Sequence, residues 1–303
     1  METGELNIVT GALSYSGKYI TRKLLAMGRR VRTITGHPGR ANPFGAQVEV
    51  APFRFDDLGG LVETLRGATT LYNTYWVRFP MKGMTYERAA ENSKALIRAA
   101  EEAGIKRIVH ISIVKPSKDS PFGYYRGKAE VEEAIRASSL SYAILRPTVF
   151  FGGEDILINN ISWSLRFFPV FPIAGKGDYR IQPIFVEDFA EIAVQQGQST
   201  ENVVWDVVGP EQYTFRELLR MICRQIGRSA LLIPVPPFAM YLGARMIGLL
   251  MRDVMLTKDE VGGLMAGLLA SDEEPRGTTK LSEWIALNQD LLGTVYASEL
   301  KRR

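Results

Sequence analysis

The chain has 303 residues, of which 46% are hydrophobic and 23% are charged, and its formal net charge is +4. This composition is typical of a globular protein with room for one large α/β domain and a smaller appendage, and the small, evenly spread positive charge argues against nucleic-acid binding. The single cysteine, Cys223, excludes an intrachain disulfide, and with two histidines it leaves too few ligands for a zinc site, so we expect no metal and a reducing, cytoplasmic setting.

The first predicted elements are a buried strand that contains Leu6 and Val9, a glycine-rich turn, and a helix with Ile20 and Leu24 on one face. We therefore expect the apolar start to be a strand and no signal peptide. Further strands are expected at Val31–Thr35, Val48–Ala51, Thr69–Trp76, Arg107–Ser112 and Tyr142–Pro147, and helices at Leu58–Leu65, 87–103 and about Gly127–Ala137. Alternating short apolar strands and helices predict an α/β fold, a doubly wound parallel sheet of the Rossmann type.

After Phe151 the alternation ends. Pro183–Gln196 is predicted to be a strand that enters a helix, and Val203–Gly209 another strand, and we expect both to rejoin the main sheet. The predicted dinucleotide-binding domain is thus 1–152 plus about 183–209. A smaller, mostly helical lobe takes about 153–182 plus 210–303, with Thr214 as the N-cap of one helix.

The segment Phe238–Met251 is apolar but shorter than the roughly 20 residues of a transmembrane helix, and Arg245 interrupts it. We expect no transmembrane span and a helix buried in the smaller lobe. Contact with a lipid surface or a protein partner is the alternative.

The turn after the first strand has the spacing T-G-x-x-S-x-x-G, with Gly11, Ser14 and Gly17 at its fixed positions. A strand that passes through a tight glycine turn into a helix places free N–H groups and the positive end of the helix dipole at one point. Small residues keep the approach open for a pyrophosphate. The turn therefore predicts dinucleotide binding through residues 11–17, namely Gly11, Ala12, Leu13, Ser14, Tyr15, Ser16 and Gly17.

A second motif, Y-x-x-x-K, is formed by Tyr124 and Lys128 after the fifth strand. Residues at i and i+4 share a helix face, so the lysine can bind a cofactor ribose while its charge lowers the pKa of the tyrosine. A phenol tuned in this way exchanges a proton with a carbonyl or alcohol near neutral pH.

With these motifs in place, the chain resembles the short-chain dehydrogenase/reductase superfamily, in its extended and atypical branches. The matching pieces are TGALSYSG, AAENSKALIRAAEEAG, RIVHIS, YYRGK, ILRPTVFFG and PIFVEDFAEIA, which follow the order of the family. The second half looks most like the branch that contains the dehydrogenase-like accessory subunit of respiratory complex I. Bacterial members of that branch are called NAD-dependent epimerase/dehydratase-like proteins.

The resemblance implies that Tyr124 is the acid/base, Lys128 its partner on the nicotinamide ribose, and Asn92 the link behind the lysine. It also implies a serine at the end of the fifth strand, which here is Ser112. Many extended members have a second, catalytic serine where this chain has Ile113, and neighbours on a strand point to opposite faces. Ser117 or Ser120, in the following loop, are the alternatives.

The choice between NADP and NAD depends on the end of the second strand. An acidic residue there favours NAD, but this chain has Gly36 and His37, with Arg40 just beyond. Both basic side chains suit a 2′-phosphate, so NADP is preferred and NAD is the alternative.

Residues that follow other strands at the same sheet edge complete the expected cofactor site. They are Thr74 after the fourth strand, and Pro147 and Val149 after the sixth, while Tyr75, Trp76 and Phe79 are candidates for the pocket wall. We expect an oxidoreductase or epimerase/dehydratase-like enzyme acting on a small hydrophobic molecule. The alternative is a non-catalytic NAD(P)H-binding scaffold or sensor that docks on a protein or membrane.

Overall fold

The structure is a computed structural model that describes residues 4–81, 83–254 and 257–302. It divides into two compact units. The first comprises Met1–Pro147 with Val186–Asp206, and the second Thr148–Phe185 with Val207–Arg303. The chain thus leaves the first unit after Pro147 and returns to it for one more helix and one more strand.

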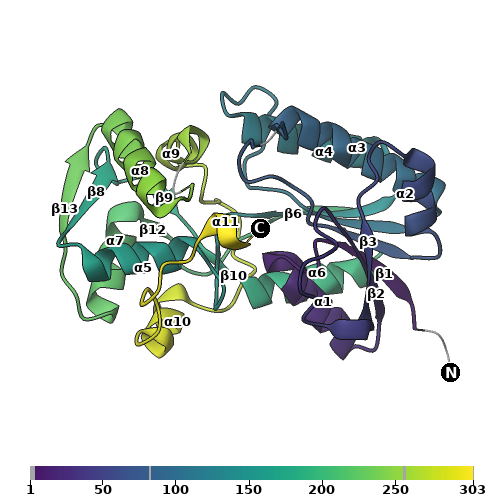
Figure 1. Cartoon of the computed structure of the whole chain (residues 1–303), viewed down its shortest axis with the longest axis horizontal. Coiled ribbons are helices and arrows are strands. Elements are labelled where there is room, and N and C mark those ends of the chain that lie inside the picture. Colours follow the sequence, from purple (N-terminus) through teal and green to yellow (C-terminus); the bar gives the residue numbers. More distant parts are fainter. Residues whose placement is uncertain (1–3, 82, 255–256, 303) are drawn as a thin grey trace. The chain divides into compact units, whose positions relative to one another are not determined.

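The first unit is built on a seven-stranded sheet in the order β11-β6-β5-β4-β1-β2-β3 (Figure 1). Every neighbouring pair from β6 to β3 is parallel. The strands are β1 (Leu6–Thr10), β2 (Arg30–Thr35), β3 (Val48–Pro52), β4 (Thr70–Asn73), β5 (Arg107–Ile111), β6 (Ser141–Pro147) and β11 (Val203–Val207). The order reverses between β1 and β4, and in such sheets a ligand binds beyond the carboxyl ends of the strands at that point.

Helices cover both faces of this sheet, which confirms the predicted doubly wound fold (Figure 1). One layer holds α2 (Leu58–Leu65), α3 (Tyr86–Glu102) and α4 (Gly123–Ala137), and the other holds α1 (Tyr15–Ala26) and α6 (Val186–Gln198). A short 3-10 turn, η1 (Gly45–Gln47), precedes β3. The core between the sheet and the first layer includes fully buried Ile8, Leu71, Leu96 and Ile108.

The starts of two helices in this unit test local features of the sequence. Asp57 caps the start of α2 by accepting a hydrogen bond of 2.9 Å from the Gly60 N–H. The predicted start of α4 at about Gly127 is wrong, since the helix begins at Gly123 with Phe122 in the N-cap position. Tyr124 therefore lies in the first turn of α4.

The second unit combines helices with three two-stranded ribbons, β7-β10, β9-β12 and β8-β13. Its strands are β7 (Phe150–Phe151), β8 (Val170–Ala174), β9 (Arg180–Ile181), β10 (Ile184–Phe185), β12 (Tyr213–Thr214) and β13 (Leu231–Val235). Its helices are α5 (Leu157–Phe167), α7 (Phe215–Gln225), α8 (Pro237–Met251), α9 (Lys258–Met265), α10 (Leu281–Asn288) and α11 (Glu299–Arg302). The expectation that the strand at Pro183 rejoins the main sheet is wrong: β10 pairs with β7, and the helix that follows it, α6, belongs to the first unit.

The core of the second unit forms around α7. Thr214 and Glu217 make a reciprocal capping box at its start, which confirms Thr214 as the N-cap. Leu218 and Ile222 are fully buried, and Cys223 is a buried free thiol.

The expectation that the apolar helix after Pro237 is buried is wrong. The exposed fractions on α8 are 74% for Phe238, 55% for Leu242 and 65% for Met246. The helix lies beside β8 with Gly248 buried, while Phe238, Leu242 and Met246 face outward. Among the described residues, no helix is both long and apolar enough to cross a membrane.

Candidate cofactor and active site

The glycine-rich turn joins the carboxyl end of β1 to α1. Gly11 has φ +68°, a left-handed conformation that a side chain would strain, and its N–H donates to the Ile34 carbonyl at 3.0 Å. A Cβ on Gly17 would lie 2.3 Å from the Gly11 carbonyl oxygen. The two glycines therefore let the start of α1 lie directly against the end of β1.

The amino end of α1 carries no side-chain cap and no acidic residue in its first turn. Ser14, its N-cap residue, instead donates its hydroxyl to the Gly11 carbonyl at 2.6 Å. The helix dipole at this end is thus not neutralised by the chain, unlike that of α3, where Thr85 accepts from the Arg88 N–H. This arrangement fits the pyrophosphate of a dinucleotide.

The remaining turn residues have more local roles. The Ala12 N–H donates to Thr33 Oγ1 at 3.0 Å, and Ala12 and Leu13 are buried, so these two residues fix the turn to β2. Tyr15 packs edge-on against Tyr19 with 5.7 Å between ring centroids, and Ser16 is half-buried.

The end of β4 lies beside this turn. The Thr74 N–H donates to Thr10 Oγ1 at 2.8 Å, and a Cβ on Gly11 would lie 3.3 Å from Thr74 Oγ1. The structure therefore brings Thr74 to the glycine turn, at the point where the strand order reverses.

Of the residues after β2, Arg40 reaches the turn. Its Nη1 donates to the Leu13 carbonyl at 3.5 Å, whereas Gly36 and His37 are exposed and the His37 N–H is bound to Thr35 Oγ1 at 3.1 Å. A guanidinium next to an uncapped helix start suits an anionic ligand with a phosphate near the second strand.

Tyr124 and Lys128 lie on one face of α4 together with the indole of Trp76, which follows β4. The Tyr124 ring meets the Trp76 ring edge-on at 5.9 Å, and the Lys128 ammonium lies over the same ring, 4.6 Å from its centroid. A Cβ on Gly127 would lie 2.8 Å from Trp76 Cη2, so this glycine is what admits the indole. Sequence analysis identified Trp76 only as a candidate for the pocket wall, and it did not identify a role for Gly127. The glycine between Tyr124 and Lys128 could have indicated that another side chain packs closely against this face of the helix.

Lys128 is almost completely buried, with 2% of its surface exposed. Its Nζ donates to the Ile111 carbonyl at 2.7 Å. Burial lowers the pKa of Lys128 to about 7, against the opposing charge of Glu132. The lysine therefore changes its protonation in the neutral pH range.

His110 is a buried histidine in the core of the first unit. It is fully buried on β5, and its Nδ1 lies 3.1 Å from the Asn73 side-chain amide. Burial, and secondarily the charge of Lys128, holds the pKa of His110 well below its usual value.

Asn92 of α3 lies close to this face but has a different partner from the expected one. Its side-chain amide donates to the Tyr75 hydroxyl at 2.9 Å. Tyr75 in turn packs against Phe53 and Phe55, each with 5.0 Å between ring centroids. These three aromatic rings gather after β3 and β4, a cluster that sequence analysis did not identify.

Ser112 is buried after β5, and its hydroxyl donates to Glu132 Oε1 at 2.6 Å. The Glu132 carboxylate also accepts two hydrogen bonds from the Arg146 guanidinium, of 2.9 and 2.6 Å. The serine that the resemblance assigns to catalysis is thus held in a buried ion-pair network on α4. Its catalytic role stays a prediction.

Pro147 and Val149 fall in different units. Pro147 ends β6, and its carbonyl accepts from the Val114 N–H at 3.1 Å. The Val149 carbonyl accepts from the Ile184 N–H at 2.9 Å within the second unit. Roles for either residue at the cofactor stay predictions.

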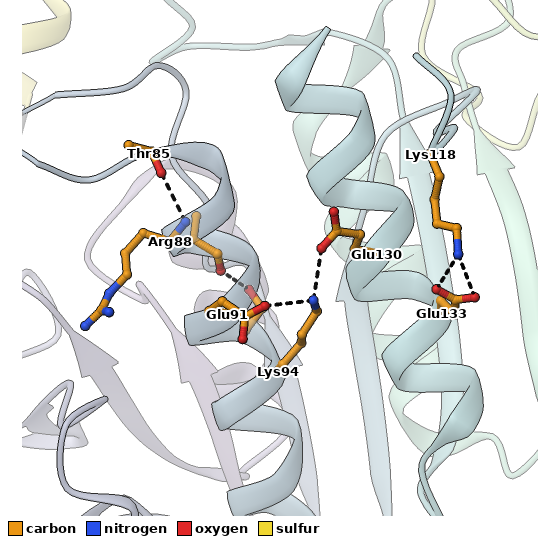
Figure 2. A network of polar contacts seen from close by, with 9 residues as sticks. Thr85, Arg88, Glu91, Lys94, Lys118, Glu130 and Glu133 are labelled. Carbon is orange, nitrogen blue, oxygen red and sulfur yellow. Dashed lines mark hydrogen bonds and ion pairs between the residues drawn. The ribbon is translucent and has the colours of Figure 1, made fainter. Parts of the chain in front are cut away.

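The Lys94–Glu130 ion pair links α3 to α4 (Figure 2). Lys94 of α3 lies between Glu91 of the same helix and Glu130 of α4, at 2.9 Å from each, and Lys118 binds Glu133. The Lys94–Glu130 pair links the helix that carries Asn92 to the helix that carries Tyr124 and Lys128, whereas Lys118–Glu133 joins α4 to the loop before it. Among the residues the structure describes, no group of His, Cys, Asp and Glu could hold a metal ion.

Comparison with known proteins agrees with this geometry. Residues 11–159 match a family model described as NAD(P)H-binding. Subunit 9 of the NADH dehydrogenase [ubiquinone] 1 alpha subcomplex from Arabidopsis thaliana is 25% identical over 295 residues, covering 89% of this chain and 72% of that protein. A ceramide reductase from Caulobacter vibrioides is 26% identical over 238 residues, covering 75% and 73%.

The fold is also that of a crystallised NADPH-dependent quinone oxidoreductase from Escherichia coli. The TM-score is 0.76 at 22% identity, over 93% of this chain and 99% of that one. Residues 11–159 are thus an NAD(P)H-binding domain, and the subunit 9 relatives and the reductase fold agree with the resemblance to the extended, atypical branch of the short-chain dehydrogenase/reductase superfamily.

Proposed function

We propose that this chain is an NAD(P)H-dependent oxidoreductase, with NADPH preferred, that acts on a carbonyl or alcohol of a small apolar molecule. The observation that carries the proposal is the α4 face, where Tyr124 and the buried Lys128 meet around Trp76. The uncapped start of α1 and the neighbouring Arg40 support the phosphate end of the same cofactor.

A bound nicotinamide supplies or accepts the hydride. Tyr124 gives its phenolic proton to the carbonyl oxygen during reduction and takes it back during oxidation. The Lys128 ammonium stabilises the phenolate that forms and binds the ribose hydroxyls. Asn92 holds Tyr75, and Ser112 holds Glu132, so both residues position the elements around the site.

Trp76 has a further role in this proposal. Its ring covers the Lys128 ammonium, so the indole must shift before Lys128 can reach a ribose. We therefore expect NADPH binding to change the fluorescence of Trp76, and Trp76→Phe to remove most of that change.

The apolar substrate is supported by one of the relatives, which is named for the reduction of ceramide, a lipid. The chain also has Ile181, flanked by Arg180, where nucleotide-sugar enzymes of the family have an arginine. This difference favours an apolar substrate over a nucleotide sugar.

A second candidate is a dinucleotide-binding scaffold or sensor without turnover. Ser112 is engaged by Glu132, buried Ile113 takes the position of the usual catalytic serine, and the complex I relatives are subunits of an assembly. The two candidates share NAD(P)H binding and differ in the fate of Tyr124→Phe, which abolishes turnover only in the enzyme.

The test is a fluorescence titration of the full chain with NADPH and with NADH, repeated on Lys128→Ala. We expect tighter binding of NADPH and a loss of at least tenfold in affinity in the variant. Lys106→Ala, at an exposed lysine before β5, is the control that leaves affinity unchanged. If neither nucleotide binds, both candidate functions are wrong.

A further inference from the structure

The outward stripe of α8 is unusual for a helix at a protein surface. Phe238, Leu242 and Met246 follow one another at helical spacing and are all more than half exposed. Each is large and apolar, and the strand that leads into α8, β13, exposes two more apolar residues, Leu231 at 64% and Ile233 at 38%. Contiguous apolar surface of this kind marks a site of interaction.

The exposed charges of the segment that carries this stripe have one sign. Between Gly227 and Thr257 the charged residues are Arg228, Arg245, Arg252 and Asp253. The three arginines are exposed, and none of them forms an ion pair with another described residue. Arg245 adjoins Met246 on the outward side of α8.

The one acidic residue of the segment is turned inward. Asp253 is 8% exposed, and its carboxylate accepts hydrogen bonds from the Tyr296 hydroxyl at 2.8 Å and the Glu299 N–H at 2.9 Å. The exposed charged residues of this segment are therefore all cationic.

We propose that the stripe Phe238–Leu242–Met246, with Arg228, Arg245 and Arg252, docks this protein on the surface of an anionic lipid bilayer. The apolar side chains enter the boundary between headgroups and acyl chains, and the arginine guanidinium groups pair with lipid phosphates. The aliphatic part of Arg245 lies along the same boundary while its charge stays in the headgroup layer. The helix lies on the membrane and does not cross it, in keeping with its length of 15 residues.

A second exposed apolar stripe in the same unit provides the contrast. Leu287, Leu291 and Val295 are 86%, 77% and 73% exposed, yet the charged residue among them is the exposed Asp290. Anionic lipid repels that surface. Charge, rather than apolar exposure alone, thus selects α8 as the docking face.

The experiment is flotation of the full-length protein with vesicles of phosphatidylcholine alone or with one quarter phosphatidylglycerol. We expect the protein to float with the anionic vesicles, and the bound fraction to fall steeply as salt is raised. The triple variant Phe238→Ser, Leu242→Ser, Met246→Ser loses at least tenfold in apparent affinity. Arg228→Gln with Arg245→Gln weakens binding and flattens the salt dependence, while Leu287→Ser with Leu291→Ser binds as the wild type.

Three outcomes overturn the proposal. The first is a wild type that stays with the soluble fraction at low salt, and the second is an equal loss of binding in the two serine variants. The third is a wild-type dimer in sedimentation that becomes a monomer in the triple variant, while neither protein binds vesicles. This outcome assigns the stripe to contact with a second copy of the chain. NADPH titration of the same variants separates this proposal from the oxidoreductase function, because the stripe lies outside the NAD(P)H-binding unit.

Discussion

The burial of Lys128, which the proposed function requires, destabilises the folded chain when the lysine is protonated. Burial lowers its pKa from the ordinary value of 10.5 to about 7, so the folded chain resists protonation that the unfolded chain accepts. Each pKa unit corresponds to about 1.4 kcal/mol, and the penalty on the charged form therefore reaches about 5 kcal/mol below pH 7. Lys128→Met keeps the length and volume of the side chain and removes this penalty.

The stability of the wild type is expected to rise between pH 7 and pH 10. Between pH 7 and pH 10 the unfolded chain keeps a proton that folded Lys128 has released, so the unfolded state binds more protons and raising the pH stabilises the wild type. The penalty amounts to about 4 kcal/mol at pH 7 and about 2 kcal/mol at pH 9. Lys128→Met has no such dependence.

The variant also loses favourable contacts. The hydrogen bond to the Ile111 carbonyl is worth about 1–2 kcal/mol, and the contact with Trp76 about as much. We therefore expect Lys128→Met to raise the free energy of unfolding at pH 7 by about 0–2 kcal/mol. Because the lost contacts vary little with pH, the advantage over the wild type falls by about 2 kcal/mol between pH 7 and pH 9.

Urea denaturation at the two pH values, followed by circular dichroism and by fluorescence, measures this difference. Lys106→Met, at an exposed lysine before β5, is the control and shows no comparable change. A difference between wild type and Lys128→Met that stays constant from pH 7 to pH 9, or grows, refutes the reasoning.

Three further predictions concern the cofactor site. Gly17→Ala places a Cβ 2.3 Å from the Gly11 carbonyl oxygen, so it lowers the melting temperature and abolishes NADPH binding in the same titration, and normal binding contradicts the described turn. Arg40→Gln weakens NADPH by about tenfold or more and leaves NADH unchanged, as parallel titrations will show, because it removes a charge-assisted contact with the 2′-phosphate. Ser112→Ala lowers the free energy of unfolding by about 1–3 kcal/mol because Glu132 loses a buried donor, while NADPH turnover stays within about threefold. A large loss of turnover with unchanged stability would instead show that Ser112 is a catalytic residue.

Much of the first unit could be predicted because its signals are local. Alternating strands and helices define a doubly wound sheet, and the glycine turn after β1 identifies its phosphate end. The Asp57 cap is set by neighbouring residues alone. The start of α4 is predicted too late because its N-cap residue, Phe122, provides no side-chain cap that would identify it in the sequence.

The rest depends on contacts between distant segments. The position of Trp76 over Lys128 follows from the absence of a side chain at Gly127, which matters only once β4 and α4 are neighbours. The partner of Ser112 lies one helix further along the chain. An apolar helix such as α8 has the same composition whether it is buried or faces outward, so sequence alone could not place Phe238 at the surface.

The most direct test of the central claim is the oxidation of NADPH by a panel of apolar ketones and quinones, for the wild type, Tyr124→Phe and Tyr125→Phe. Tyr125 is the buried neighbour on α4 and serves as the matched control. We predict that Tyr124→Phe lowers turnover by about 100-fold or more while NADPH affinity stays within about threefold, and that Tyr125→Phe keeps its turnover. A wild type that binds NADPH but oxidises it with no carbonyl, or a Tyr124→Phe variant with full turnover, contradicts the account.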